Sequence, residues 1–209
     1  MSSKMGETGS HIGGNEPKSI AGLGFLTVLE HPEHGLFGGY LLLNPAGRPL
    51  EFHCTAPIKP NRAQEILYGP TLQSFLYGDQ IGRTLLEKSK IEPLFICTDK
   101  QPVLAVREHI SQPVALVLPS DNDGVDPADK TLRIDAAHPG GLPPGGPRLK
   151  TFQLGRNHLA VLERSAEDQR AISERFTRLA DSFAEPFDLA EPFTRIREAI
   201  EEAQQGVLK

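Results

Sequence analysis

The sequence predicts an α+β fold in which a helical segment covers an antiparallel or mixed sheet in the order βββ-α(α)-βββ. A proline- and glycine-rich linker and two C-terminal amphipathic helices follow. Two groups of three short apolar runs flank one helical segment, and the last forty residues carry apolar side chains at helical spacing. Strands and helices do not alternate throughout, which argues against a dinucleotide-binding arrangement of parallel strands.

The six runs are short, rich in branched side chains and bounded by turn residues, as strands are. The first group forms a meander, because a proline and a glycine follow its first run and Asn44, Pro45 and Gly47 follow its second. The expected strands are 23–29, 37–43, 49–54, 93–98, 103–106 and 113–118.

The helical segment between the two groups begins at Arg62. Asn61 and Gln64 have the spacing of a capping box. Gly69 and Pro70 interrupt the helix, and Thr71 caps its continuation, whose apolar face is laid on the sheet. Glycines 69, 78 and 82 lower helix propensity, which indicates either close helix-on-sheet packing or the approach of a ligand.

The chain divides by composition into four parts. A polar, glycine-containing N-terminus is expected to be disordered, and an acidic and then Pro/Gly-rich stretch is expected to be a linker. After the linker, 149–154 and 158–162 form a possible hairpin that either rejoins the sheet or packs with the tail. The expected parts are the disordered N-terminus 1–19, the core domain 20–118, the linker 119–148, and the hairpin with helical tail 149–209.

The tail contains two amphipathic helices. Ser165 and Asp168 resemble a capping box before the first helix. The second helix has a narrow apolar stripe and a charged remainder, and a stripe of this kind must be buried against the body, the preceding helix or another chain. We predict that it binds a partner through Leu189, Phe193, Ile196 and Ile200.

Composition limits the partners and the compartment. The chain has 209 residues and a formal net charge of −5, so it offers no general attraction for nucleic acid or anionic membranes. The N-terminus has no apolar stretch that could act as a signal peptide, and no later apolar run approaches the roughly 18 residues of a membrane span, so a cytoplasmic location is expected. Cys54 and Cys97 are the only cysteines, and both are expected to stay thiols.

The stretch with the most candidate functional side chains is the strand–loop–helix junction 52–62, which contains a thiol, an imidazole and two cationic groups. The candidate ligand-binding residues are His53, Cys54, Lys59, Asn61, Arg62, Cys97 and Asp99. Helix N-termini bind anions and acidify nearby thiols, so Cys54 could act as a thiolate, His53 as a base, and Lys59 and Arg62 as anion anchors. Neighbours on a strand face opposite sides, so the two side chains share a pocket only if the strand has ended or bulged. Alternatively, Cys54 is a small core residue and His53 is solvated, because free cysteine usually serves as inert packing.

A metal site is not expected. His53, Cys54, Cys97 and Asp99 could hold zinc only if their two strands were neighbours, and no short ligand-pair spacing supports such a site. The sequence also lacks the glycine-rich phosphate-binding, zinc-protease and nucleophile-elbow motifs. No catalytic residue and no cofactor is therefore assigned, and whether the protein is an enzyme stays open.

Four stretches resemble an uncharacterised bacterial family of the planctomycete type. They are EFHCTAPIKPNRAQEILYGPTL, YGDQIGRTLLEKSK, the CTD at residues 97–99, and DLAEPFTRIREAIEEA. The resemblance implies a cytosolic bacterial protein and no particular reaction. We expect a non-enzymatic interaction or regulatory module that binds itself, as a homo-oligomer, or a protein partner through its sheet and tail. The alternative is a small enzyme or ligand-binding protein with a thiol, anion or metal site at the junction 52–62.

Overall fold

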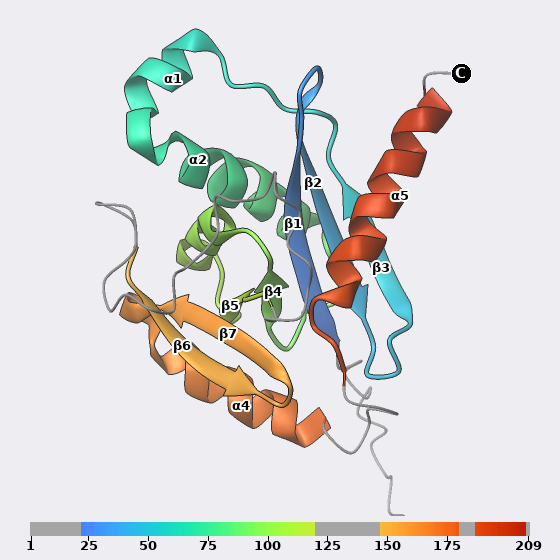
Figure 1. Cartoon of the computed structure of the whole chain (residues 1–209), viewed down its shortest axis with the longest axis vertical. Coiled ribbons are helices and arrows are strands. Elements are labelled where there is room, and N and C mark those ends of the chain that lie inside the picture. The colour runs from blue at the N-terminus through green and yellow to red at the C-terminus, as the bar shows by residue number, and fades with distance from the viewer. Residues whose placement is uncertain (1–21, 120–146, 180–186, 208–209) are drawn as a thin grey trace, which may run out of the picture.

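A computed structural model describes residues 22–119, 147–179 and 187–207, with side chains described as far as residue 204. The expected disordered segment 1–19 and nearly all of the expected linker 119–148 lie outside the described residues, as does the break between the two tail helices at residues 185 and 186. The described residues form one mixed sheet with helices on both faces (Figure 1). This architecture confirms the α+β class.

The sheet has seven strands in the order β3-β2-β1-β4-β5-β7-β6. The N-terminal meander pairs antiparallel, whereas β4 runs parallel to β1 and β5 runs parallel to β4. The strands are β1 (Leu23–His31), β2 (Gly35–Leu43), β3 (Pro49–Cys54), β4 (Ile96–Thr98), β5 (Val114–Val117), β6 (Leu149–Leu154) and β7 (Asn157–Leu162).

The expected strand at 103–106 is wrong. These residues lie in a 3₁₀ helix, η3 (Gln101–Glu108), with Pro102 in its first turn. Parallel neighbours such as β4 and β5 need a connection that crosses one face of the sheet, and η3 provides it. Val103, Leu104 and Val106 are all buried where this crossover packs on the sheet.

The helical segment after β3 begins as predicted. α1 (Arg62–Tyr68) starts at Asn61 with a complete capping box, and Gly69 ends it with a positive φ of 46°. A 3₁₀ turn, η1 (Gly69–Thr71), and α2 (Leu72–Ser74) follow. The predicted Thr71 cap is absent, because the Thr71 hydroxyl donates to the Tyr68 carbonyl instead. The segment continues as a π-helix, η2 (Phe75–Gly82), and ends as α3 (Arg83–Lys88).

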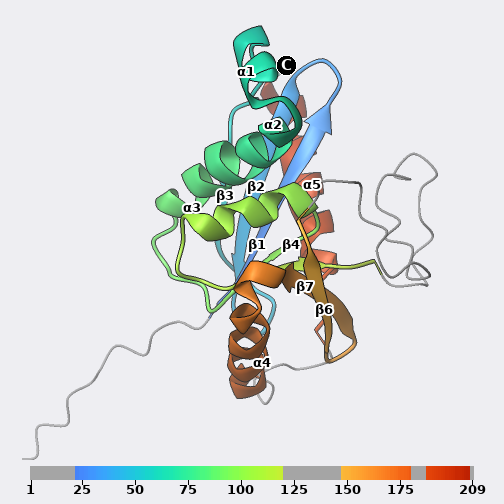
Figure 2. The ribbon, with the colours of Figure 1, turned by 90° about the vertical axis from the view of Figure 1, so that its left-hand side faces the viewer.

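The two faces of the sheet carry separate hydrophobic cores. The segment from η2 to α3 and the crossover η3 pack on one face, and α4 (Glu167–Leu179) and α5 (Glu191–Val207) pack on the other. Figure 1 shows α2 and α5 on opposite sides of β1 and β2, and Figure 2 shows the same two layers from the side.

Gly38 and Gly39 allow both helical layers to approach β2. A Cβ at Gly38 would lie 2.1 Å from Cγ2 of Ile81, and a Cβ at Gly39 would lie 2.3 Å from Cγ2 of Ile196. Neighbouring residues of a strand face opposite sides, so each glycine accommodates one layer. On η2, a Cβ at Gly78 would lie 2.6 Å from Cβ of Ala105. Close packing thus accounts for Gly78 and for Gly82, where a Cβ would lie 3.0 Å from the Tyr77 carbonyl, whereas Gly69 has open space around it and provides the positive φ that ends α1.

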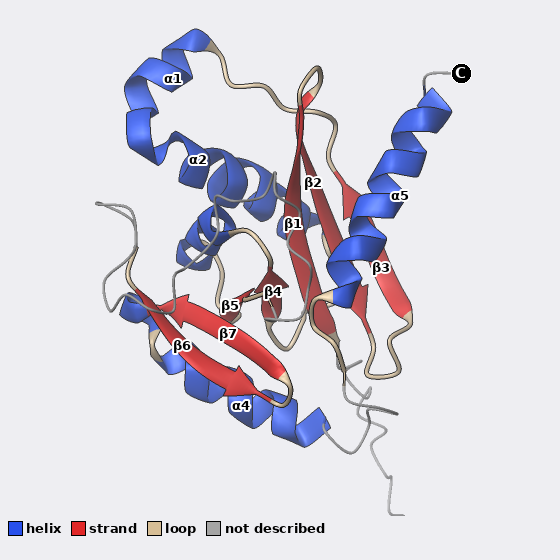
Figure 3. Cartoon of the chain, in the orientation of Figure 1, coloured by secondary structure: helices blue, strands red, loops and turns tan. Residues whose placement is uncertain are grey.

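The hairpin of β6 and β7 rejoins the main sheet, since β7 pairs antiparallel with β5. Figure 3 shows this hairpin with α4 beside it. Strands from both sides of the expected linker therefore belong to one sheet, and residues of α4 and α5 complete one of its cores. None of the helices in the described ranges is long and apolar enough to cross a membrane.

Candidate functional site

The junction 52–62 does not assemble the predicted thiol and imidazole pair. Cys54 is exposed on the face of the sheet that carries α5, opposite Gly39 of β2. His53 lies on the other face, where its ring is nearly parallel to that of Tyr40 at 6.4 Å between centroids. The alternation of the strand therefore separates the two side chains, and Cys54 is not a core residue either.

The two predicted anion anchors, Lys59 and Arg62, and the neighbouring candidate Asn61 all bind other groups of the chain. Lys59 donates to the backbone carbonyl of Glu33, and Nη1 of Arg62 lies 3.0 Å from Oε2 of Glu65. The Asn61 side chain accepts from the backbone N–H of Gln64 at 2.9 Å. The N-terminus of α1 is thus capped by its own residues, and the Lys59 and Arg62 side chains point to Glu33 and Glu65 and not to a shared anion site.

Cys97 and Asp99 lie far from Cys54. Cys97 lies in β4 and Asp99 directly follows it, and β4 is separated from β3 by both β1 and β2, so the two thiols do not share a site. Cys97 is fully buried, and burial raises the pKa of its thiol far above the ordinary value. Within the ranges that the structure describes, no cluster of three or more His, Cys, Asp or Glu side chains could hold a metal ion.

Asp99 forms a polar contact at the end of β4. The Thr27 hydroxyl donates to Oδ1 of Asp99 at 2.5 Å, and Thr27 is fully buried. Burial of Asp99 raises the pKa of its carboxyl, although the Thr27 hydrogen bond opposes the shift. This pair joins the neighbouring strands β1 and β4 and has no second titratable group bound to it by a hydrogen bond in the described structure.

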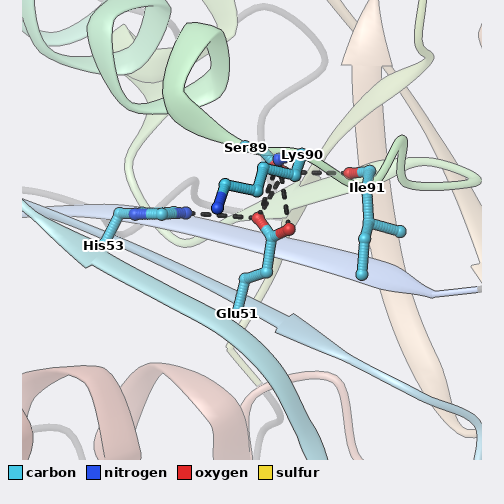
Figure 4. Close-up of polar contacts among 5 residues, drawn as sticks. All are labelled: Glu51, His53, Ser89, Lys90 and Ile91. Atoms are coloured by element: carbon cyan, nitrogen blue, oxygen red, sulfur yellow. Dashed lines mark hydrogen bonds and ion pairs between the residues drawn. The ribbon is translucent and has the colours of Figure 1, made fainter.

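A polar cluster that the sequence reasoning missed surrounds Glu51 (Figure 4). One of its carboxylate oxygens, Oε2, accepts from the Ser89 hydroxyl at 2.9 Å, from the Lys90 backbone N–H at 3.1 Å and from Nε2 of His53 at 3.2 Å. Burial alone would raise the pKa of Glu51, but these hydrogen bonds outweigh it and hold the pKa below the ordinary value.

The hydrogen bonds of the Glu51 cluster attach β3 to Ser89 and Lys90, which directly follow α3. Ser89 donates to Glu51, not to His53, so the imidazole is not placed to remove the proton of the hydroxyl. The cluster therefore lacks the geometry of a nucleophilic site. The sequence signal was Glu51 two residues before His53 on one strand, which places both on the same face.

Two more polar contacts hold the π-helix η2. The Tyr77 hydroxyl donates to the Glu30 carboxylate of β1. Burial is the larger cause that raises the pKa of Tyr77, and the Glu30 contact raises it further. Oδ1 of Asp79 lies 2.8 Å from Nε2 of His109, the residue that ends η3. These contacts attach the π-helix to β1 and η3, in agreement with the packing interpretation of this segment.

The apolar stripe of α5 is not a free surface. Leu189, Phe193, Ile196 and Ile200 are all buried in the same core as residues of β1 and β2. The prediction that these four side chains bind a partner is therefore corrected. The helix docks on its own sheet because Gly39 leaves room for Ile196 and Ile200.

Exposed apolar side chains occur instead on α1. Ile66 is 65% exposed and Leu67 is 81% exposed, and α1 contains no buried residue. The helix lies at an outer corner of the molecule, away from the sheet (Figures 1 and 2). At its end, Tyr68 stacks on Phe75 with 4.0 Å between ring centroids, which attaches α1 to the next part of the segment. We call Ile66 and Leu67 the α1 patch.

Compared with known proteins, the chain matches no family model and no curated sequence. Function must therefore be inferred from the surfaces and contacts described above.

Proposed function

We propose that this chain is a protein-interaction module that binds a partner protein through the α1 patch. The observation that carries the proposal is the exposure of Ile66 and Leu67 on a helix that buries none of its own residues. Single exposed apolar residues are common, but two large adjacent ones on a projecting helix suggest an interaction site.

The helix is held in shape without being packed. Seven residues are too few for a stable isolated helix in water. The capping box of Asn61 and Gln64 and the stacking of Tyr68 on Phe75 fix its two ends. A partner that covers Ile66 and Leu67 would supply the missing burial and would stabilise the helix further.

The size of the α1 patch favours a partner with a groove. Two side chains cannot supply the roughly 800 Å² per partner of an ordinary flat interface. Neighbouring residues of a helix point about 100° apart, so a partner must reach around α1 to cover both Ile66 and Leu67, and an apolar groove does this. We therefore infer a different protein with an apolar groove, not a second α1 helix.

Site-specific cross-linking tests the proposal. A photoreactive amino acid at position 67 should give one dominant cross-linked protein in the source cells, whereas the same group at the exposed position 88 on α3 should not. The cross-linked protein is then purified, and its binding to the full chain is measured by calorimetry. We expect Leu67→Ser to weaken binding at least about tenfold, since burial of a leucine contributes about 1.5–3 kcal/mol.

Two results would contradict this proposal. One is equal cross-linking from positions 67 and 88. The other is binding of the purified protein with unchanged affinity to Leu67→Ser, with Lys88→Ser as the matched surface control.

A further inference from the structure

β3 is the terminal strand of the sheet, and half of its backbone groups face the open edge. The Thr55 N–H donates to the Gly38 carbonyl at 3.0 Å, and the residues opposite Tyr40 and Leu42 are His53 and Glu51. Backbone bonding alternates along an antiparallel strand. The N–H and C=O groups of Phe52 and Cys54 therefore point away from β2.

This edge has two of the usual protections against strand pairing, the inward charge of Glu51 and the bulge at Leu50, but both precede Phe52 and Cys54 and leave the backbone groups of those two residues open. Terminal strands normally carry lysine, proline or inward charges that discourage a neighbour. The opposite terminal strand, β6, exposes Lys150, but β3 contains no basic residue apart from His53 and exposes Phe52 and Cys54. Pro49 is the first residue of β3 and leaves the donors of Phe52 and Cys54 in place.

We propose that a second copy of this chain pairs antiparallel with β3 across a two-fold axis at His53. In this register Phe52 of each copy lies directly opposite Cys54 of the other copy. Each of the two pairs exchanges both backbone hydrogen bonds, so all the open N–H and C=O groups of Phe52 and Cys54 find partners. The two seven-stranded sheets join into one continuous sheet.

The side chains on both faces are compatible with this register. On the face of Tyr40, Glu51 lies opposite Thr55 of the second copy. The Thr55 hydroxyl oxygen accepts the Gly38 N–H at 2.9 Å, so its own proton is available for the Glu51 carboxylate across the axis. Hydrogen bonds hold the pKa of Glu51 low, which keeps that carboxylate an acceptor. On the other face, Phe52 covers Cys54.

The bulge in β3 selects this register over the neighbouring one. An axis at Phe52 would place Cys54 opposite Leu50. The register between β2 and β3 shifts at Leu42 and Leu43, and Leu50 has no partner in β2. Bulged residues disrupt the regular alternation of hydrogen bonds, so that pairing would be incomplete.

Light scattering after size exclusion, followed by sedimentation equilibrium, tests the proposal on the full chain. We expect a concentration-dependent dimer. Phe52→Pro removes an open-edge donor that β2 does not use, and Cys54→Lys places like charges near the axis. Each should raise the dimer dissociation constant at least about tenfold while the far-ultraviolet circular dichroism is retained. Gln153→Lys, on the other terminal strand, is the matched control and should have no effect.

A covalent trap gives an independent measurement. In a Cys54→Ser background, His53→Cys places two thiols directly across the two-fold axis, at a Cα separation of about 4.5 Å. Mild oxidation should then give a disulfide-linked dimer, whereas Gln153→Cys in the same background should not.

The proposal is overturned if the wild-type chain is monomeric at the highest soluble concentration, or if its dimer persists unchanged in both β3 variants. Leu67→Ser should leave the dimer intact, so loss of self-association and loss of the α1 interaction are distinguishable.

Discussion

Arg107 and Asp168 join the two helical layers of the molecule at the start of β5. Nε of Arg107 lies 2.7 Å from Oδ2 of Asp168, and a second bond of 3.1 Å connects Nη2 with Oδ1. The same carboxylate accepts the Val114 N–H at 3.3 Å, and Nη1 of Arg107 donates to the Ile110 carbonyl. η3 on one face and α4 on the other are thereby fixed relative to the sheet.

We expect Asp168→Ala to lower the free energy of unfolding by about 3 kcal/mol. The substitution leaves a half-buried guanidinium and a buried backbone N–H without an acceptor, and removing one partner of a buried pair is costly. Chemical denaturation measures the change. Glu174→Ala breaks the solvent-exposed pair with Arg170 and should change the free energy of unfolding far less. Equal effects of the two substitutions would show that the Arg107–Asp168 pair contributes little.

Ile196→Ala should destabilise the fold without changing self-association. Its side chain fills the space above Gly39, and deletion of buried methyl groups leaves a cavity that costs about 2–5 kcal/mol. Thermal unfolding and light scattering together measure both properties. Glu198→Ala on the exposed side of α5 is the control. A stable variant with an altered oligomeric state would revive the partner-binding interpretation of the α5 stripe.

Glu51 should make stability depend on pH. Its pKa in the folded chain lies below the ordinary value of 4.5, so the ionised carboxylate stabilises the fold above that pH. The contribution is lost as the pH falls through the lower, folded-state pKa. Glu51→Gln should therefore cost about 1–2 kcal/mol at neutral pH, and its stability should converge with that of the wild type in acid. Urea titrations at several pH values measure this difference.

The control for the pH series is Glu65→Gln on the exposed helix α1, where the carboxylate forms an exposed ion pair with Arg62. A constant difference between wild type and Glu51→Gln across the whole pH range would contradict the assignment.

The two cysteines should differ sharply in reactivity. Cys54 is exposed, whereas Cys97 is fully buried and burial raises its pKa. Alkylation at a concentration at which the chain is monomeric, followed by mass spectrometry, should therefore label one thiol in the native chain and the second only after unfolding. In Cys54→Ser no thiol should be labelled without denaturant. Rapid native labelling of Cys97 would show that the α5 layer opens readily.

Local signals in the sequence predicted most of the secondary structure. The three strands of the meander, the capping box at Asn61 and the hairpin of β6 and β7 depend on residues close together in the chain, such as turn residues and alternating side chains. The helical spacing of Phe193, Ile196 and Ile200 also predicted correctly that one face of α5 is apolar. Each of these features is specified by neighbours within a few positions.

Only the tertiary structure decided how those elements are used. The stretch 103–106 has strand-like residues but must cross a face between two parallel strands, so it is a 3₁₀ helix. The π-helix between β3 and β4 approaches that crossover closely at Gly78, which lies against Ala105. These outcomes depend on contacts between distant segments, which local propensity does not encode.

The candidate site shows the same division. The sequence by itself determined that His53 and Cys54 lie on opposite faces and that Glu51 and His53 share one, because a strand alternates. It could not determine that β1 and β2 separate Cys54 from Cys97, or that Gly39 admits the α5 stripe to the core. Strand order and helix docking depend on which surfaces bury the most apolar area together, and that choice belongs to the folded chain as a whole.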